Sequence, residues 1–151
     1  MENNFIDFPL FVVPETEPKY CSGDNREQVL VVYQATTDRE MLETFLSNVL
    51  KAVQLDIEKD ITLISLTPGE TFSLSRLRKH LPVKKAIVFG PAPSAIGLQC
   101  PEQRYQLLSF RGMTCLFADE LERIHQERQQ GGKRLSTALW QSLKALFPRE
   151  P

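Results

Sequence analysis

The apolar positions of the chain fall into short continuous runs, separated by stretches with helical spacing. The runs Val29–Tyr33, Ile61–Leu66 and Lys85–Phe89 are typical of strands that are buried on both faces of a sheet. Between the first two runs, apolar residues recur every three or four positions over residues 41–53, which predicts an amphipathic helix. Strands that alternate with helices indicate an α/β fold with a mostly parallel central sheet.

The second half of the chain continues this pattern with shorter segments. In chain order they are a short basic helix at Ser73–Leu81, a helix start at Pro91–Leu98, strands at Tyr105–Phe110 and Met113–Phe117, and helices at Asp119–Gln129 and Leu135–Phe147. The pattern therefore predicts a three-layer α/β sandwich with four to five strands. We assign it to a single domain over residues 28–151. Trp140, on the last predicted helix, is interpreted as a core residue, with an exposed interface anchor as the alternative.

Residues 1–27 form a leader without clear periodicity. The leader holds a compact apolar cluster over residues 5–13, which includes Phe5, Phe8, Leu10 and Phe11. So many apolar side chains are costly to leave in water. Either the cluster packs on the domain as an edge element, or it docks into another protein with these four residues as anchors.

Composition and charge narrow the class of protein. The chain has 151 residues, of which 42% are hydrophobic and 25% charged, as in ordinary globular domains. No apolar run approaches the roughly 20 residues that cross a bilayer, and no basic signal segment is visible, so we expect a cytoplasmic protein without a membrane partner. The three cysteines Cys21, Cys100 and Cys115 are too few and too widely spaced for a disulfide framework or a four-thiolate metal site. We expect neither a metal nor another cofactor.

Charge is distributed unevenly along the chain. Residues 1–70 hold thirteen acidic and five basic residues, a net charge of −8, whereas residues 71–151 hold six acidic and thirteen basic residues, a net charge of +7. The asymmetry favours an anionic partner for the basic half. The alternative is that the two halves attract each other within the fold.

Parallel sheets bind ligands at the carboxyl ends of their strands. The loops at those ends are Gln34–Asp38, Leu66–Thr71 and Gly90–Ala95. Gly90 stands alone, and the prolines that follow it remove backbone donors, so neither a P-loop nor a dinucleotide fingerprint is present. Asp38 is the one carboxylate at a predicted strand end, but its place near a helix start favours a capping role. No nucleophile lies near a histidine and a carboxylate, so the residues indicate a scaffold without an active site.

The order of these segments resembles the uracil-DNA glycosylase fold in its small bacterial form. Phe45–Leu66 resembles the helix and strand of that family, Lys84–Leu98 its later strand-turn-helix, and Arg134–Leu146 its closing helix. The loop at Gln34–Asp38 lacks the glycines and the water-activating acid of the catalytic loop, and the His-Pro loop and the iron–sulfur cysteines are missing. The resemblance therefore implies a fold without glycosylase activity. A vestigial cleft is expected at Gln34, Asp38, Gly90 and Ser94.

The chain also resembles the non-catalytic psi-subunit family of bacterial DNA polymerase III. It shares a short N-terminal apolar peptide, a helix of LSNVLKAVQL type before a strand, and an ending with Ala138–Gln141 and Phe147–Arg149. This resemblance implies a non-enzymatic adaptor whose leader docks on clamp-loader subunits and whose domain binds the chi subunit. One alternative is a divergent glycosylase-like repair enzyme or nucleic-acid binder, favoured by the basic stretch Arg76–Lys85. Another is a small-molecule α/β enzyme with an unrecognised site.

Overall fold

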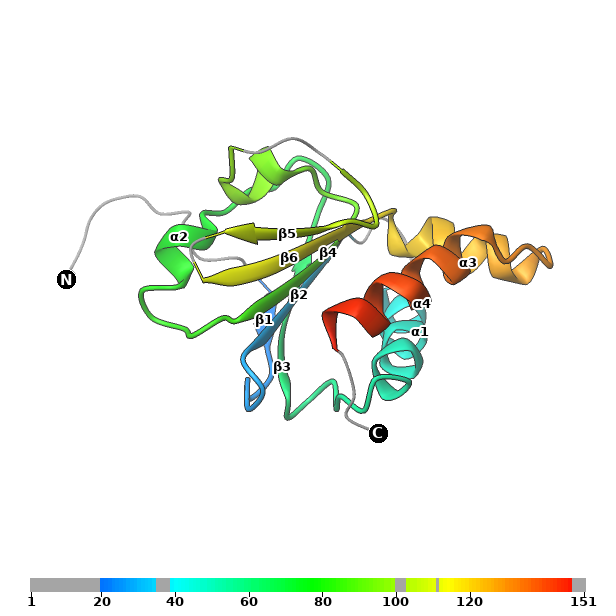
Figure 1. Ribbon diagram of the computed structural model, residues 1–151, viewed down its shortest axis with the longest axis horizontal. Coiled ribbons are helices and arrows are strands. Elements are labelled where there is room, and N and C mark those ends of the chain that lie inside the picture. Colours follow the sequence, from blue (N-terminus) through cyan, green and yellow to red (C-terminus); the bar gives the residue numbers. More distant parts are fainter. Residues whose placement is uncertain (1–19, 35–38, 100–102, 111, 148–151) are drawn as a thin grey trace.

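A computed structural model describes residues 20–34, 39–99, 103–110 and 112–147. Its described part is a mixed α/β fold with a six-stranded sheet and four α-helices (Figure 1). The strands are β1 (Tyr20–Ser22), β2 (Val29–Gln34), β3 (Ile61–Leu66), β4 (Lys85–Phe89), β5 (Leu107–Phe110) and β6 (Met113–Ala118). They are arranged in the order β1-β3-β2-β4-β6-β5.

The four central strands are parallel, and the two edge strands run antiparallel to their neighbours. In this register Val31 of β2 pairs with Leu63 of β3 and with Ile87 of β4. All three side chains are buried, as the continuous apolar runs predict for a sheet covered on both faces. The carboxyl ends of β2, β3, β4 and β6 consequently meet at one edge of the sheet.

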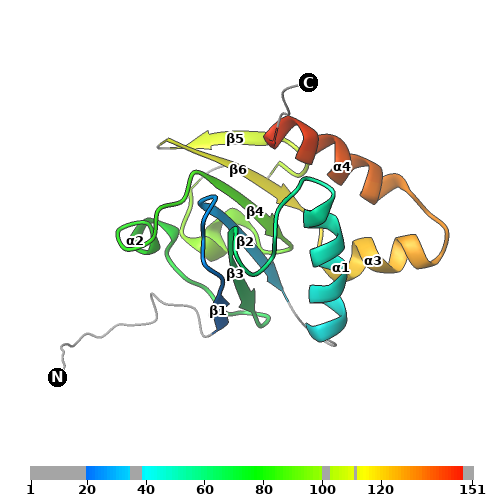
Figure 2. The same ribbon diagram turned by 90° about the horizontal axis from the view of Figure 1, so that it is seen from below.

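Three helices pack on one face of the sheet: α1 (Arg39–Lys51), α3 (Leu121–Gln129) and α4 (Arg134–Leu146). Figures 1 and 2 show them grouped on that side, where α4 contacts β6 and α3 contacts both α1 and α4. The other face is covered more thinly. There the helix α2 (Leu74–Leu77) and a 3-10 turn (Pro93–Ile96) place Leu74 and Ile96 over the alternate strand residues.

Most of the predicted elements are confirmed, but the strand count is wrong. The sheet has six strands instead of four to five, because residues 20–22, assigned to the leader, pair with β3 as an edge strand. A segment of three residues is too short to show a period in the sequence. The α/β class with a mostly parallel sheet is confirmed, whereas the closer likeness to a glycosylase-type sandwich stays a prediction.

Two predicted helices are much shorter than expected. Ser73–Leu81 forms α-helix only at Leu74–Leu77, where the hydroxyl of Ser73 accepts a hydrogen bond from the backbone N–H of Arg76. The expected helix at Pro91–Leu98 is a 3-10 turn of four residues. Gly97 ends that turn in the left-handed conformation, with φ 81°, and the two prolines near its start cannot donate backbone hydrogen bonds.

Candidate functional site

The edge where the parallel strands end brings together two of the predicted cleft residues. Gly90 follows β4 with φ 109°, a conformation that favours glycine. A Cβ atom at this position would lie 3.6 Å from the Cβ of Gln34 and 3.0 Å from the Cγ of Glu120. Ser94 is exposed in the 3-10 turn, and Asp38 lies outside the described residues. Gln34 and Gly90 are therefore neighbours, with the Glu120 side chain against the glycine.

An arginine closes the same corner from a third segment. The guanidinium of Arg104 donates hydrogen bonds to the backbone carbonyls of Ala118 and Gly90, the second at 3.2 Å. The N–H of Gly90 donates to the Ala118 carbonyl at 3.1 Å. These bonds join the ends of β4 and β6. The guanidinium of Arg104 therefore serves as a hydrogen-bond donor to the protein's own backbone carbonyls.

The next polar cluster also binds within the fold. The hydroxyl of Tyr105 donates to the carboxylate of Asp119 at 2.8 Å, and Ser142 donates to the Tyr105 carbonyl at 3.1 Å. Burial, reinforced by the Asp119 carboxylate, raises the pKa of Tyr105 well above its ordinary value. Tyr105 has φ 64°, so the predicted strand at Tyr105–Phe110 begins only at Leu107. These contacts fix α4 and the start of α3 to the chain before β5.

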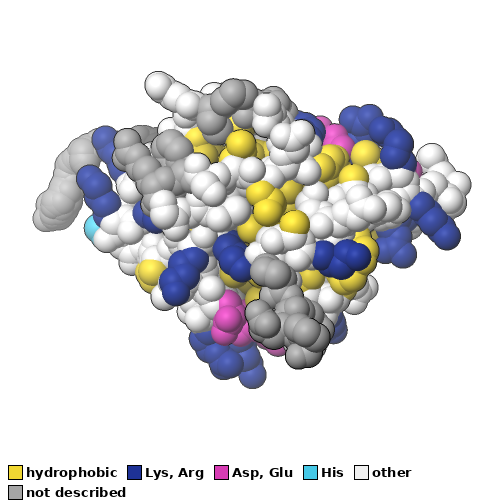
Figure 3. Space-filling model, viewed as in Figure 1, with side chains coloured by type: hydrophobic (Ala, Val, Ile, Leu, Met, Phe, Trp, Pro, Cys, Tyr) yellow, Lys and Arg dark blue, Asp and Glu magenta, His cyan; other side chains and the backbone are white. Residues whose placement is uncertain are grey.

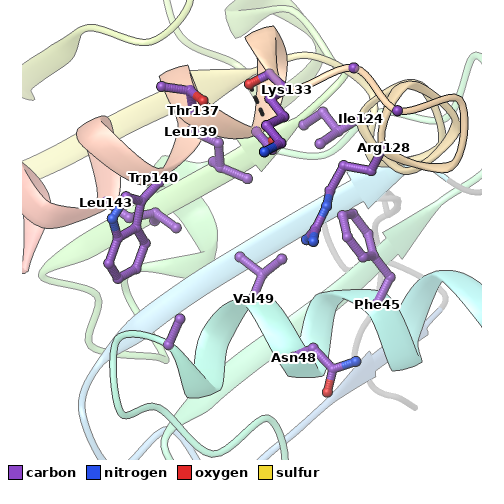
Figure 4. A pocket seen from close by; sticks show the side chains of 14 residues that line it. Phe45, Asn48, Val49, Ile124, Arg128, Lys133, Thr137, Leu139, Trp140 and Leu143 are labelled. Atoms are coloured by element: carbon purple, nitrogen blue, oxygen red, sulfur yellow. Dashed lines mark hydrogen bonds between the residues drawn. The ribbon is translucent and has the colours of Figure 1, made fainter.

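A separate groove lies in the helical layer between α1, α3 and α4. It encloses about 470 Å³ and is lined by Phe45, Asn48, Val49, Ala52, Ile124, Arg128, Gly131, Gly132, Lys133, Ser136, Thr137, Leu139, Trp140 and Leu143. Figure 4 shows Phe45 and Val49 of α1 facing Leu139 and Trp140 of α4 across it, with Arg128 reaching in from α3. The two charged residues of the lining, Arg128 and Lys133, are both basic. The groove therefore combines an apolar floor with a positively charged rim.

Trp140 is the most conspicuous side chain of this groove. It is 40% exposed, whereas its neighbour Leu139 is buried in the core. The interpretation of Trp140 as a core residue is therefore wrong, and the alternative of an exposed residue is correct. The ammonium group of Lys144 lies 5.7 Å from the centre of the indole ring. On the face seen in Figure 3, hydrophobic atoms are visible between the sheet and α4, with Lys and Arg side chains beside them.

A second cleft, of about 510 Å³, lies on the other flank of α1 and is acidic. Its lining includes four acidic residues against the single basic residue Lys51, namely Asp24, Glu40, Glu43 and Glu58. The buried hydroxyl of Tyr33 donates to the Glu43 carboxylate at 2.7 Å, which ties this helix to β2. Within the described ranges, no group of three or more His, Cys, Asp or Glu side chains could hold a metal ion. The two flanks of α1 thus carry opposite charge.

No protein-family model matches the chain, and no curated protein is significantly similar to it in sequence. Among the described residues, no helix has the length and apolar character of a membrane span. The predicted anchors Phe5, Phe8, Leu10 and Phe11 lie outside the described residues.

Sequence reasoning missed the groove because its lining comes from three separate helices. The signal in the sequence is the spacing of Phe45 and Val49, which places both on one face of α1. The structure shows that this face lies across the groove from Trp140 of α4.

Proposed function

We propose that this protein is a non-enzymatic adaptor, similar to the psi subunit of bacterial DNA polymerase III, that acts as a clamp-loader accessory. The observation that carries the proposal is the apolar groove with the half-exposed Trp140. Aromatic side chains in such surroundings are typical anchors of protein interfaces. The strand ends, where an α/β enzyme would hold its substrate, contain instead Arg104 bound to backbone carbonyls.

In this proposal the adaptor uses two surfaces. The leader supplies Phe5, Phe8, Leu10 and Phe11 as a docking peptide for clamp-loader subunits, and the helical layer supplies the groove. Aromatic rings carry much of the binding energy in interfaces of this kind, because each ring removes a large apolar area from water. Two separated docking surfaces would allow the chain to join two other proteins.

A pull-down with purified clamp-loader subunits tests the proposal. The full chain should capture them, and deletion of residues 1–14 should abolish capture. Capture that persists unchanged after this deletion would exclude the leader as the docking peptide. The pair Asn3→Ser with Asn4→Ser keeps all the apolar anchors of the leader, so it should preserve clamp-loader capture and serves as the matched control.

The alternative function is a nucleic-acid binder or a divergent glycosylase-like repair enzyme. It draws on the basic stretch Arg76–Lys85, in which Arg76, Lys79 and Lys84 are exposed. Binding through such residues depends on phosphate contacts, so it should appear at low salt and weaken steeply as salt rises. Titration of labelled single-stranded and uracil-containing DNA separates the functions, because an adaptor without DNA contacts gives no signal at low salt.

A further inference from the structure

The groove between α1, α3 and α4 needs an occupant that is both apolar and acidic. Its floor is formed by the buried ring of Phe45, the partly buried Val49 and the half-exposed Trp140, and its charged lining residues Arg128 and Lys133 are basic. A segment that fills it must bury apolar side chains against this floor and place carboxylates near the two cations. The positive charge at the rim would also repel a basic occupant.

The chain itself contains a segment of this chemistry. Residues 1–18 hold four acidic residues, Glu2, Asp7, Glu15 and Glu17, and no basic residue. Between the first two acids and after them lie the three phenylalanines of the leader. We propose that the leader of the same chain docks in the groove, with its phenylalanine rings on the apolar floor and its carboxylates toward Arg128 and Lys133.

The length of the leader permits this contact. Tyr20 pairs with Ser65 near the carboxyl end of β3, the same end of the sheet at which α1 begins. The fifteen residues from Phe5 to Tyr20 can span about 50 Å when extended. A helix of the length of α1 extends about 20 Å, and six strands are about 25 Å across. The leader can therefore pass the start of α1 and reach the groove.

This docking rests on the proposed function in one respect only. The proposed function gives the leader a binding place on clamp-loader subunits, and the groove is its second binding place. In the free protein the leader covers the groove and shields its own phenylalanines from water.

Trp140 is the single tryptophan of the chain, so its fluorescence reports on the groove alone. The neutral quencher acrylamide measures how accessible the indole is, without a bias from charge substitutions. In the full chain, the triple variant Phe5→Ser, Phe8→Ser and Phe11→Ser should raise the quenching constant severalfold. Each lost ring lowers the ratio of docked to undocked leader about tenfold. The matched control, Asn3→Ser with Asn4→Ser, should leave quenching unchanged.

A charge exchange tests the orientation. The pair Arg128→Glu with Lys133→Glu should raise quenching, and so should Glu2→Lys with Asp7→Lys. All four substitutions together should restore the low value, since the opposite charges then face each other again. Circular dichroism confirms that each variant is folded.

Two outcomes overturn the inference. In one, the quenching constant of the full chain equals that of the triple phenylalanine variant, so that nothing covers Trp140. In the other, quenching rises on about a hundredfold dilution, which means that the leader of a second copy fills the groove. Neither outcome changes the result of the clamp-loader pull-down. The pull-down measures whether the leader binds clamp-loader subunits, and not where the leader lies in the free protein.

Discussion

Arg104 offers a direct test of the view that the strand-end corner is structural. Its guanidinium donates to the carbonyls of Ala118 and Gly90, and we consider the substitution Arg104→Met, which keeps much of the side-chain volume. A hydrogen bond from a charged donor contributes about 1.5–3 kcal/mol. The Ala118 carbonyl keeps its bond from the Gly90 N–H, so the loss there is partial. We expect the free energy of unfolding to fall by about 2–3 kcal/mol in total.

Urea unfolding followed by circular dichroism measures this change. With a slope of about 2 kcal/mol/M, the midpoint should fall by roughly 1 M. The matched control is Arg123→Met. It removes the salt bridge between the Arg123 guanidinium and the Asp119 carboxylate, which are 3.7 Å apart, and the Arg123 side chain is 65% exposed. Exposed pairs of this kind contribute at most about 1 kcal/mol. If Arg104→Met and Arg123→Met shift the midpoint equally, the corner is not held by the Arg104 hydrogen bonds and the reasoning is refuted.

Three further predictions concern the corner, the groove and the buried tyrosines. Gly90→Ala should lower the free energy of unfolding by about 2 kcal/mol, because its φ is 109° and the new Cβ would lie 3.0 Å from the Glu120 side chain; an unchanged urea midpoint would contradict this. Leu139→Ala should cost about 2–5 kcal/mol in the same assay, whereas Trp140→Ser should cost about 1 kcal/mol or less because the indole is 40% exposed; equal costs would mean that Trp140 belongs to the core. Burial raises the pKa of Tyr33 and Tyr105 above the ordinary value, so the stability these residues contribute is complete below the unfolded pKa near 10 and is lost as pH rises above it. Two phenol groups should therefore ionise only with alkaline unfolding when absorbance is followed, and a normal titration of all tyrosines in the folded state would contradict this.

The central strands could be predicted because their signal is local. Val29–Tyr33 and Ile61–Leu66 are continuous apolar runs, and a strand buried on both faces requires such a run. The helix α1 was equally evident from its spacing. The edge strand β1 could not be predicted, since its three residues are recognised only by their pairing with β3.

The candidate site was less accessible to sequence reasoning, because it depends on contacts between distant residues. The proximity of Gln34 and Gly90 follows from strand ends that share one edge, and this was expected. Arg104 lies fourteen positions along the chain from both Gly90 and Ala118. The sequence alone therefore could not show that it donates to their carbonyls. The exposure of Trp140 depends in the same way on how α4 packs against α3 and β6, which no helical period specifies.

We propose that the chain is an adaptor whose phenylalanine-rich leader docks on clamp-loader subunits. The most direct measurement is the affinity of the full chain for purified clamp-loader subunits, compared with the variant that carries serine at Phe5, Phe8, Leu10 and Phe11. We expect the variant to bind at least about a hundredfold more weakly, while Asn3→Ser with Asn4→Ser binds normally. Equal affinity of the full chain and the serine variant, or no binding by either, would contradict the proposed adaptor function.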